Sequence, residues 1–245
     1  MEADPELGLR VPAEKIREAR AELLAPMRSL DRGLWEAPQE HDAGHLGYLM
    51  LEGLLGRDVI LAGTTTTELL GPGDVVQPFV SMHDDTLIRY HVLWHVLEPV
   101  KFAQLDDNFS RALGKWPPVM RVLLDRALRR SLRVSMHAAL LQLSPVETRL
   151  LFMFWLLADR WGRVTPDGVR LKLQLSHQLL GQLVGCRRAS ITTALHRMEE
   201  SGLVTRRSDR TWLLRGEPPD ELAHIYWQER VAGAISHDLR DSLIG

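Results

Sequence analysis

Residues 175–215 read LSHQLLGQLVGCRRASITTALHRMEESGLVTRRSDRTWLLR and contain the pattern on which the interpretation of the whole chain depends. Ser176 is suited to cap a helix, because its hydroxyl accepts hydrogen bonds from unpaired backbone N–H groups. The apolar face of that helix would hold Leu179, Leu180, Leu183 and Val184. Glycine inside a helix costs about 1 kcal/mol relative to alanine, so Gly181 predicts that another helix crosses close to it.

A second helix is predicted from about Arg187 to Glu200, after a turn at Gly185 that would need a positive φ. One side of this helix is apolar and holds Ile191, Ala194, Leu195 and Met198. The other side is polar and basic and holds Arg188, Thr192, Thr193 and Arg197. Short helices joined by a glycine turn, the second with a polar face, are typical of a helix-turn-helix whose second helix enters the DNA major groove. The alternative is an ordinary helical hairpin with a solvated arginine face.

The segment after this helix completes the pattern. Gly202 is followed by the apolar pair Leu203-Val204, the basic pair Arg206-Arg207 and an apolar run at residues 212–214. This order predicts a β-hairpin wing with a basic tip around Arg210. The glycines, the cap, the arginines and the wing occur together, which favours DNA binding over the hairpin alternative. We place the DNA-reading element between Ser176 and Glu200.

Upstream of this stretch, a further helix and a hairpin are predicted. Ser144, Pro145 and Glu147 stand at the spacing of a capping box, with serine as N-cap, proline at the first helical position and glutamate at the third. This helix is expected to stop at Gly162. Pro166-Asp167-Gly168 separates two short β-like runs, which predicts a hairpin.

Residues 116–143 are predicted to form one long helix, because no Pro or Gly follows Pro118 in this segment. A seam of residues at alternating four- and three-residue steps is typical of two helices packing along each other: Met120, Leu124, Ala127, Ser131, Val134, Ala138 and Leu141. A second apolar edge is expected to pack on the N-terminal domain: Leu123, Leu128, Leu132 and Met136. We interpret the seam as a homodimer contact. A buried helix with no partner chain is the alternative.

The N-terminal part has a different sequence pattern. Residues 1 to about 35 form a leader with a short helix within Lys15–Leu30, interrupted by Pro26. From about His41 to Leu105, short apolar runs alternate with glycines at near-regular intervals, which predicts the strands of a small barrel or sandwich. The sequence Gly71-Pro72-Gly73-Asp74 is a strong turn signal between two of these strands.

Composition and charge restrict the class of protein. Apolar residues make up 45% and charged residues 25% of the chain, as in folded globular proteins. Residues 144–215 hold 12 of the 30 Lys/Arg but only 6 of the 32 Asp/Glu, and such a basic segment suits a surface that meets phosphate. The single cysteine, Cys186, excludes an intrachain disulfide and a four-thiolate metal site. No signal sequence or membrane-spanning stretch is found, so a cytoplasmic location is expected.

Residues 175–204, LSHQLLGQLVGCRRASITTALHRMEESGLV, resemble the DNA-binding half of the Crp–Fnr family of bacterial regulators. Residues 149–175, RLLFMFWLLADRWGRVTPDGVRLKLQL, are similar to that family's first winged-helix element and its hairpin. The turn at Gly71–Asp74 and the long helix extend the resemblance more loosely. It implies an N-terminal β-roll of the cyclic-nucleotide-binding type, dimerisation through the long helix, and DNA-binding domains that a signal in the β-roll reorients.

The resemblance also implies which residues touch DNA. Arg188 lies where the family's cyclic-AMP receptor has its guanine-reading arginine, whereas Ala189 and Thr193 replace its other two base readers, a glutamate and an arginine. The operator of that receptor is therefore not assumed. Arg187 is an additional candidate reader, and phosphate contacts are expected at Ser176, His177, Gln178 and Ser190. The full predicted DNA-binding set is Ser176, His177, Gln178, Arg187, Arg188, Ser190, Thr192, Thr193, Arg197 and Arg210.

The effector site departs from the family pattern. Cyclic-nucleotide binders of the family have a Gly-Glu-Leu after the Pro-Gly-Asp turn and then an Arg-Ser or Arg-Thr pair, which hold the ribose and the phosphate. Here Val75-Val76-Gln77-Pro78-Phe79 follows the turn, and the next arginine, Arg89, precedes Tyr90. Cyclic AMP is therefore not expected to bind, and the small-molecule effector is unknown.

Other residues with ligand chemistry are interpreted as structural. His83, His91 and His95 suit haem or a metal in principle, but lone histidines in β-rich segments are more often structural or solvated. Cys186 is expected to pack rather than to act as a redox switch. No metal and no cofactor is predicted.

The predicted fold class is α+β, with an N-terminal β-roll of jelly-roll type, a long dimerisation helix and a C-terminal winged helix-turn-helix. The expected boundaries are residues 1–115, 116–143 and 144–215, followed by a tail, 216–245, that is expected to be helical. The predicted function is a homodimeric transcription regulator on palindromic double-stranded DNA, with RNA polymerase as a further candidate partner.

Other function classes are weaker. An enzyme is not predicted, because the sequence offers no nucleophile–base pair, no Gly-rich phosphate loop and no metal-spaced carboxylate/His set. The remaining alternative is an effector-independent DNA-binding protein, or a protein–protein adaptor, with a vestigial sensor domain. A loss of affinity for duplex DNA with rising salt would distinguish DNA binding from the adaptor role.

Overall fold

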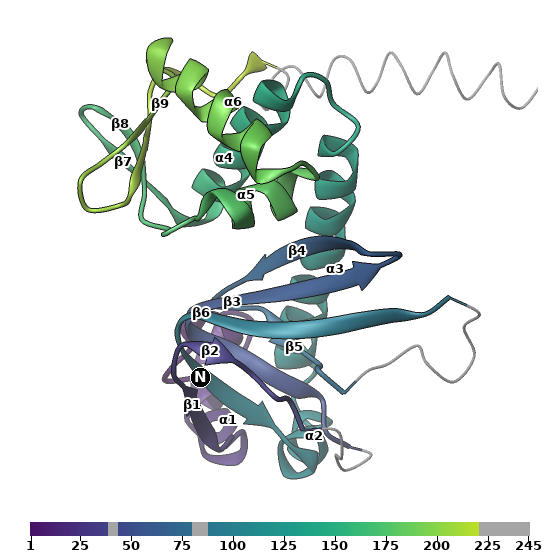
Figure 1. The fold of residues 1–245 in the computed structure, drawn as a ribbon. Helices are drawn as coiled ribbons and strands as arrows, with labels where there is room; N and C mark the ends of the chain where they lie inside the picture. Colours follow the sequence, from purple (N-terminus) through teal and green to yellow (C-terminus); the bar gives the residue numbers. More distant parts are fainter. Residues whose placement is uncertain (39–43, 80–87, 221–245) are drawn as a thin grey trace, which may run out of the picture. The chain divides into compact units, whose positions relative to one another are not determined.

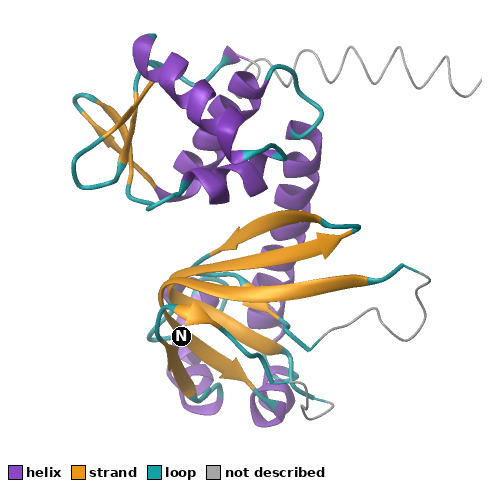
Figure 2. Ribbon diagram, viewed as in Figure 1, coloured by secondary structure: helices purple, strands orange, loops and turns teal. Residues whose placement is uncertain are grey.

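The computed structural model describes residues 1–38, 44–79 and 88–220. The chain divides into two compact units, Met1–Met136 and His137–Gly245 (Figure 1). The first unit holds a β-sheet with flanking helices, and the second holds helices and a smaller sheet (Figure 2). Residues 221–245, where a helix was expected, lie outside the described residues, as does His83. No helix in the described ranges has the length and apolar character needed to cross a membrane.

An antiparallel sheet forms the centre of the first unit. Strands β3 (Gly47–Leu61) and β6 (Tyr90–Leu105) pair along almost their whole length, and β4 (Thr64–Leu70) extends the sheet beyond β3. Strand β1 (Met27–Leu30) pairs with the other edge of β6, which gives the order β1-β6-β3-β4. The short strands β2 (Gly33–Leu34) and β5 (Val75–Val76) pair with β6 and β3.

Strand β3 is longer than the runs that the glycine spacing predicted. The runs before and after Gly56 are one strand of 15 residues, because bulges let the pairing with β6 continue past the glycines. At Gly53 the backbone has a φ of +91°, and a Cβ would lie 2.1 Å from the carbonyl oxygen of Pro99. Conformation and space therefore both require glycine at this position.

The predicted turn at Gly71–Asp74 is confirmed, and it joins β4 to β5. The carboxylate of Asp74 accepts a hydrogen bond from the Gly71 N–H at 3.0 Å and another from Arg133. Asp74 is only 3% exposed, so these partners offset the cost of burying its charge.

The leader is only partly helical. It forms η1 (Pro5–Gly8), η2 (Ala13–Lys15) and α1 (Ile16–Glu22). The helix expected within Lys15–Leu30 therefore ends at Glu22, and the residues after Pro26 form strand β1, because proline does not continue a helix. A core cluster joins the leader to α2 (Asp107–Leu113) and α3 (Pro117–Leu140) through buried residues that include Leu7, Ala19, Leu113 and Val119.

Helix α3 confirms the predicted long helix, but the prediction for its sheet-facing side was wrong. Leu123 is buried, whereas Leu128, Leu132 and Met136 are exposed by 59%, 61% and 41%, so the second apolar edge does not pack on the sheet. Three arginines of α3 contact other parts of the first unit instead, each paired with a carboxylate distant in sequence: Arg126 with Asp4, Arg130 with Glu68, and Arg133 with Asp74.

Glu68 is the centre of this ion-pair network. Arg130 donates to its two carboxylate oxygens at 2.8 and 3.0 Å, and Arg57 pairs with it at 2.7 Å. Burial raises the pKa of Glu68, but the hydrogen bond from Arg130 and the charges of both arginines outweigh burial and lower that pKa below its ordinary value. The resulting stabilisation is present above the unfolded-state pKa and is lost as the pH falls through the lowered folded-state pKa.

The second unit contains α4 (Val146–Trp161), α5 (His177–Val184), α6 (Arg188–Glu200) and a four-stranded antiparallel sheet. The sheet has the order β7-β8-β10-β9, formed by Gly162–Thr165, Gly168–Leu171, Trp212–Leu214 and Val204–Arg206. The β7–β8 pair confirms the predicted hairpin, and α4 ends before Gly162 as predicted. Phe154 and Trp212, both fully buried, pack with ring centroids 5.0 Å apart.

The predicted capping box at the start of α4 is wrong. The helix begins at Val146 with Pro145 as its N-cap, and no side chain caps it by a hydrogen bond. Ser144 lies one residue too early, which puts Glu147 at the second helical position instead of the third. The Glu147 carboxylate instead pairs with Arg197 of α6 at 2.6 Å.

Replacing Gly53 by alanine is expected to lower the free energy of unfolding by about 3 kcal/mol, because the new methyl group meets a carbonyl oxygen in a left-handed conformation. Gly63→Ala is the matched control: Gly63 has a φ of +75° but nothing within 4 Å of its Cβ position, so only about 1 kcal/mol of conformational cost is expected. Thermal unfolding measures both. Equal losses for the two variants would contradict the packing at Gly53.

Candidate nucleic-acid interface

Helix α5 has the two ends that the sequence predicted. The Ser176 hydroxyl caps its start by accepting a hydrogen bond from the Leu179 N–H at 3.1 Å. Helix α5 ends at its C-cap residue, Gly185, whose backbone has a left-handed conformation with φ of +66° and ψ of +44°. A side chain with a Cβ is strained in this conformation, so Gly185 allows the chain to turn sharply into α6.

Gly181 faces the turn at close range. A Cβ at this position would lie 2.6 Å from the carbonyl oxygen of Cys186, and the Cys186 N–H donates to the Gly181 carbonyl at 2.9 Å. The space that glycine provides is thus filled by the backbone of the turn, whereas the sequence had predicted a crossing helix. Cys186 itself is half-buried, and burial raises the pKa of its thiol.

Helix α6 has one buried side and one exposed side. The four residues predicted to be apolar and inward are all buried: Ile191, Ala194, Leu195 and Met198. The helix packs with α4, α5 and β9 through this stripe. Arg188 in the first turn and Thr192 and Thr193 in the next are exposed. The packing of the stripe therefore directs the polar face of α6 outward.

Strands β9 and β10 form the predicted wing. Their turn is closed by the hydrogen bond from the Arg207 N–H to the Thr211 carbonyl at 2.9 Å, and Arg210 lies in it with a positive φ of 64°. Arg206, at the end of β9, has its guanidinium 5.5 Å from the centre of the buried Trp212 ring. The Arg206 N–H also donates to Glu199 at 3.3 Å, which ties the wing to α6.

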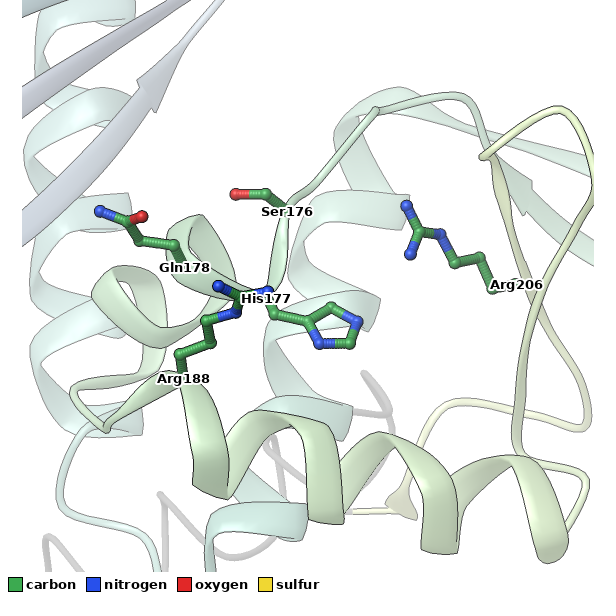
Figure 3. A pocket seen from close by; sticks show the side chains of 5 residues that line it. All are labelled: Ser176, His177, Gln178, Arg188 and Arg206. Atoms are coloured by element: carbon green, nitrogen blue, oxygen red, sulfur yellow. The ribbon is translucent and has the colours of Figure 1, made fainter.

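Five side chains from three neighbouring elements line a hollow of about 340 Å³. They are Ser176, His177 and Gln178 at the start of α5, Arg188 at the start of α6, and Arg206 from β9 (Figure 3). Four of the five belong to the predicted DNA-binding set. Arg206 does not, although the basic pair Arg206-Arg207 was recognised as part of the wing, because the sequence does not show which arginine of the pair faces α5.

His177 lies between the two arginines of this hollow (Figure 3). Its Nδ1 atom is 3.0 Å from the Thr192 hydroxyl. Burial, and then the positive charges of Arg206 and Arg188, lower the pKa of His177 below its ordinary value, with Glu199 acting in the opposite direction. The hollow therefore concentrates positive charge around the imidazole and disfavours its protonation.

The other predicted contact residues lie outside the hollow. Arg187 is the N-cap residue of α6, and Ser190 and Thr193 are exposed on the same helix. The guanidinium of Arg197 donates to Glu147 on α4 at 2.6 Å, so this arginine has a structural partner. Arg210 is exposed in the turn of the wing.

One candidate ligand in the first unit, His95, has a structural partner. His95 Nε2 lies 3.1 Å from the carboxylate of the buried Asp58, which also accepts a hydrogen bond from Thr67. Arg89, the arginine after the Gly71–Asp74 turn, is exposed before β6. Within the described ranges, no three His, Cys, Asp or Glu side chains are grouped so as to hold a metal ion.

The second unit is similar to a known family of DNA-binding domains. Residues 138–218 match the model of the Crp-like helix-turn-helix domain. The global nitrogen regulator of Synechococcus elongatus is 29% identical over 116 residues, which are 47% of this chain and 51% of that protein. The global nitrogen regulator of Synechocystis is 26% identical over 117 residues. The chain thus matches about half the length of these curated relatives.

Solved structures share the fold over both units. FixK2 from Bradyrhizobium japonicum has a TM-score of 0.61 at 17% identity, covering 79% of this chain and 94% of that one. The c-di-GMP responsive global regulator CLP of Xanthomonas campestris has a TM-score of 0.60 at 19% identity, covering 84% and 100%. A CRP/FNR-family transcriptional regulator from Thermus thermophilus has a TM-score of 0.57 at 16% identity, covering 78% and 94%.

These comparisons confirm the predicted resemblance and the predicted fold class. The chain carries a Crp-like helix-turn-helix domain and has the α+β fold of CRP/FNR regulators, with an N-terminal β-sheet domain and a C-terminal helix-turn-helix. The match to the helix-turn-helix model and the similarity to the global nitrogen regulator support a role in DNA binding and transcription regulation.

Replacing Gly181 by alanine tests the geometry of the turn, because the sign of the change in protein stability depends on that geometry. In an ordinary helix interior this change is stabilising by about 1 kcal/mol. Here it is expected to be destabilising by about 1–3 kcal/mol, because the methyl group would overlap the Cys186 carbonyl oxygen. Chemical denaturation of the variant measures the change. A gain in stability would contradict the close approach between α5 and the turn.

Proposed function

We propose that this chain is a homodimeric, sequence-specific transcription regulator of the Crp–Fnr type, and that α6 reads DNA from the major groove. The observation that carries the proposal is the exposed start of α6, where Arg188 lines the cationic hollow. A short helix with a buried apolar stripe and a basic solvent face is what a groove-reading helix requires. A cytoplasmic location follows from this function.

Arg188 is the residue we propose as the main base reader. The planar guanidinium matches the O6 and N7 acceptors of guanine, and such a bidentate contact discriminates by about 1–3 kcal/mol against a wrong base. Arg187 is a further reader, and Ala189 and Thr193 provide no charged contact. The operator should therefore share the guanine contact with other family members and differ at neighbouring positions.

Polar residues around Arg188 are proposed to bind backbone phosphates and so to fix the position of the protein along the DNA duplex. Ser176, His177, Gln178 and Ser190 surround the start of the helix pair, and the wing adds Arg206 and Arg210. A helix N-terminus attracts phosphate through its unpaired N–H groups, and Arg206 adds a full charge. Arg197 is a weaker candidate, because contact with DNA would have to compete with Glu147.

Dimerisation is proposed to occur through the exposed apolar side of α3. Met120, Leu124, Leu128 and Leu132 are 44–61% exposed, and the small residues Ala127 and Ser131 lie among them. Large apolar side chains at helical spacing on one exposed face favour packing against a second helix. A two-fold dimer would set two recognition helices about 34 Å apart, so the operator should be palindromic. RNA polymerase is a further proposed partner.

The first unit is proposed to be a sensor that does not bind cyclic AMP. The turn at Gly71–Asp74 lacks the glutamate that takes the ribose hydroxyl, and its Asp74 is already bonded to Arg133. The ion pairs that already connect α3 to Asp4, Glu68 and Asp74 favour one second candidate, in which the protein binds DNA without an effector. The two candidates differ in whether cell extract changes the affinity for DNA.

Arg188→Ala is expected to abolish sequence-specific binding while the protein remains folded and dimeric. Its matched control is Arg163→Ala, since Arg163 is an exposed arginine of β7 that lies outside the hollow. A gel-shift titration on a duplex selected for binding measures both variants. The proposal fails if Arg188→Ala binds that duplex as tightly as the original protein.

Leu124→Glu is expected to convert the dimer to a monomer, because a buried charge at the helix seam has no partner. Leu9→Glu is the control, because Leu9 is also exposed, at 77%, but lies outside α3. Light scattering gives the mass of each variant. A dimer that survives the change at Leu124 would exclude the proposed interface.

A further inference from the structure

We propose that His177 is a proton-linked contact to a DNA phosphate, in a subsite that Arg206 of the wing completes, so that affinity for DNA rises as the imidazole becomes protonated. The inference rests on the proposed function, since it requires that the hollow meets duplex DNA. It goes beyond that function by making the binding step itself sensitive to pH.

The hydrogen bonds around Thr192 favour one tautomer of His177. The Thr192 hydroxyl donates its single proton to the Arg188 carbonyl at 3.1 Å. It must then accept at its contact with Nδ1 of His177, so Nδ1 carries a hydrogen and donates. In the neutral imidazole, Nε2 is therefore the atom without a proton. Protonation adds a donor at Nε2 and leaves the bond to Thr192 intact.

The charges that face His177 come from two elements. Arg206 on β9 and Arg188 on α6 oppose protonation, and Glu199 on α6 favours it. Burial, and then the two arginines, lower the pKa of His177 in the free protein, whereas Glu199 acts in the opposite direction. A phosphate in the hollow adds negative charge beside the same ring, which raises the pKa in the complex. The difference between the two states couples proton uptake to DNA binding.

Arg206 is held in place for this role. Its backbone N–H is bonded to Glu199, which ties β9 to α6, and its guanidinium lies 5.5 Å from the centre of the buried Trp212 ring. In Figure 3 its side chain projects toward the imidazole from the side opposite Arg188. Arg207, the next residue, does not line the hollow.

The occupant that fits is a phosphate of the duplex backbone. The hollow joins two guanidiniums, a titratable ring and the capped start of α5, and a phosphate is the group that uses all of these at once. Such a contact is independent of base sequence. A fluorescent duplex of random sequence, about 30 base pairs long to span both half-sites, is therefore sufficient as a probe.

The test is fluorescence anisotropy of that duplex at constant salt between about pH 8.5 and about pH 5.5, the range in which histidine titrates. For the original protein, affinity should rise about tenfold as the pH falls, which corresponds to a pKa difference of about one unit between complex and free protein. His177→Gln should lose this dependence. His196→Gln, which removes an exposed histidine of α6 outside the hollow, should keep it.

Two further variants separate the role in binding from a role in folding. His177→Arg carries a permanent charge, so it should bind tightly at every pH with no titration. Arg206→Gln should bind more weakly throughout, and its pH midpoint should move upward because one opposing charge is gone. Thermal unfolding at each pH confirms that the compared proteins are folded.

The outcomes distinguish this inference from the proposed function. Absence of duplex binding at every pH would overturn the proposed function. Binding with the same pH dependence in the original protein and in both His177 variants would overturn the inference alone, as would a pH dependence that disappears only in His196→Gln.

Discussion

Between α5 and α6, the carbonyl oxygen of Cys186 approaches Gly181 so closely that a Cβ there would lie 2.6 Å from it. Together with the left-handed backbone of Gly185, this approach decides the direction in which α6 leaves the turn. The apolar stripe of α6 then packs with α4, α5 and β9, and its polar face is left in solvent. The meeting of Arg188, His177 and Arg206 in one hollow depends on this backbone geometry.

Two groups of arginines, one in each unit, serve different purposes. In the first unit, Arg126, Arg130 and Arg133 are each paired with a carboxylate, and these pairs connect α3 to the leader, to β4 and to the Gly71–Asp74 turn. In the second, the charges of Arg188 and Arg206 converge on His177, with only partial opposition from Glu199. A purely structural network would pair such charges, as the first unit does. Converging charges are instead relieved when an anion binds, which suits a surface for nucleic acid.

The sequence predicted the helix-turn-helix of the second unit, because the signals for this motif are local. The cap at Ser176, the turn at Gly185 and the buried stripe of α6 each lie within a few residues, and all three agree with the structure. The first unit depends on distant pairs. The carboxylates that bind the arginines of α3 lie 59 to 122 residues away, so leucine spacing alone put Leu128 and Leu132 on the wrong side of the helix. Arg206 was missed because a pair of basic residues in a strand does not reveal which one faces a neighbouring helix.

Selection of bound sequences from a random pool of duplex DNA tests most directly whether α6 reads DNA. The purified protein should enrich a two-fold symmetric site whose half-sites are centred about one helical turn, roughly 10 base pairs, apart and share a guanine at the position that Arg188 contacts. A pool that stays random through repeated rounds, although the protein is folded and dimeric, would contradict the assignment of this chain as a sequence-specific DNA-binding regulator.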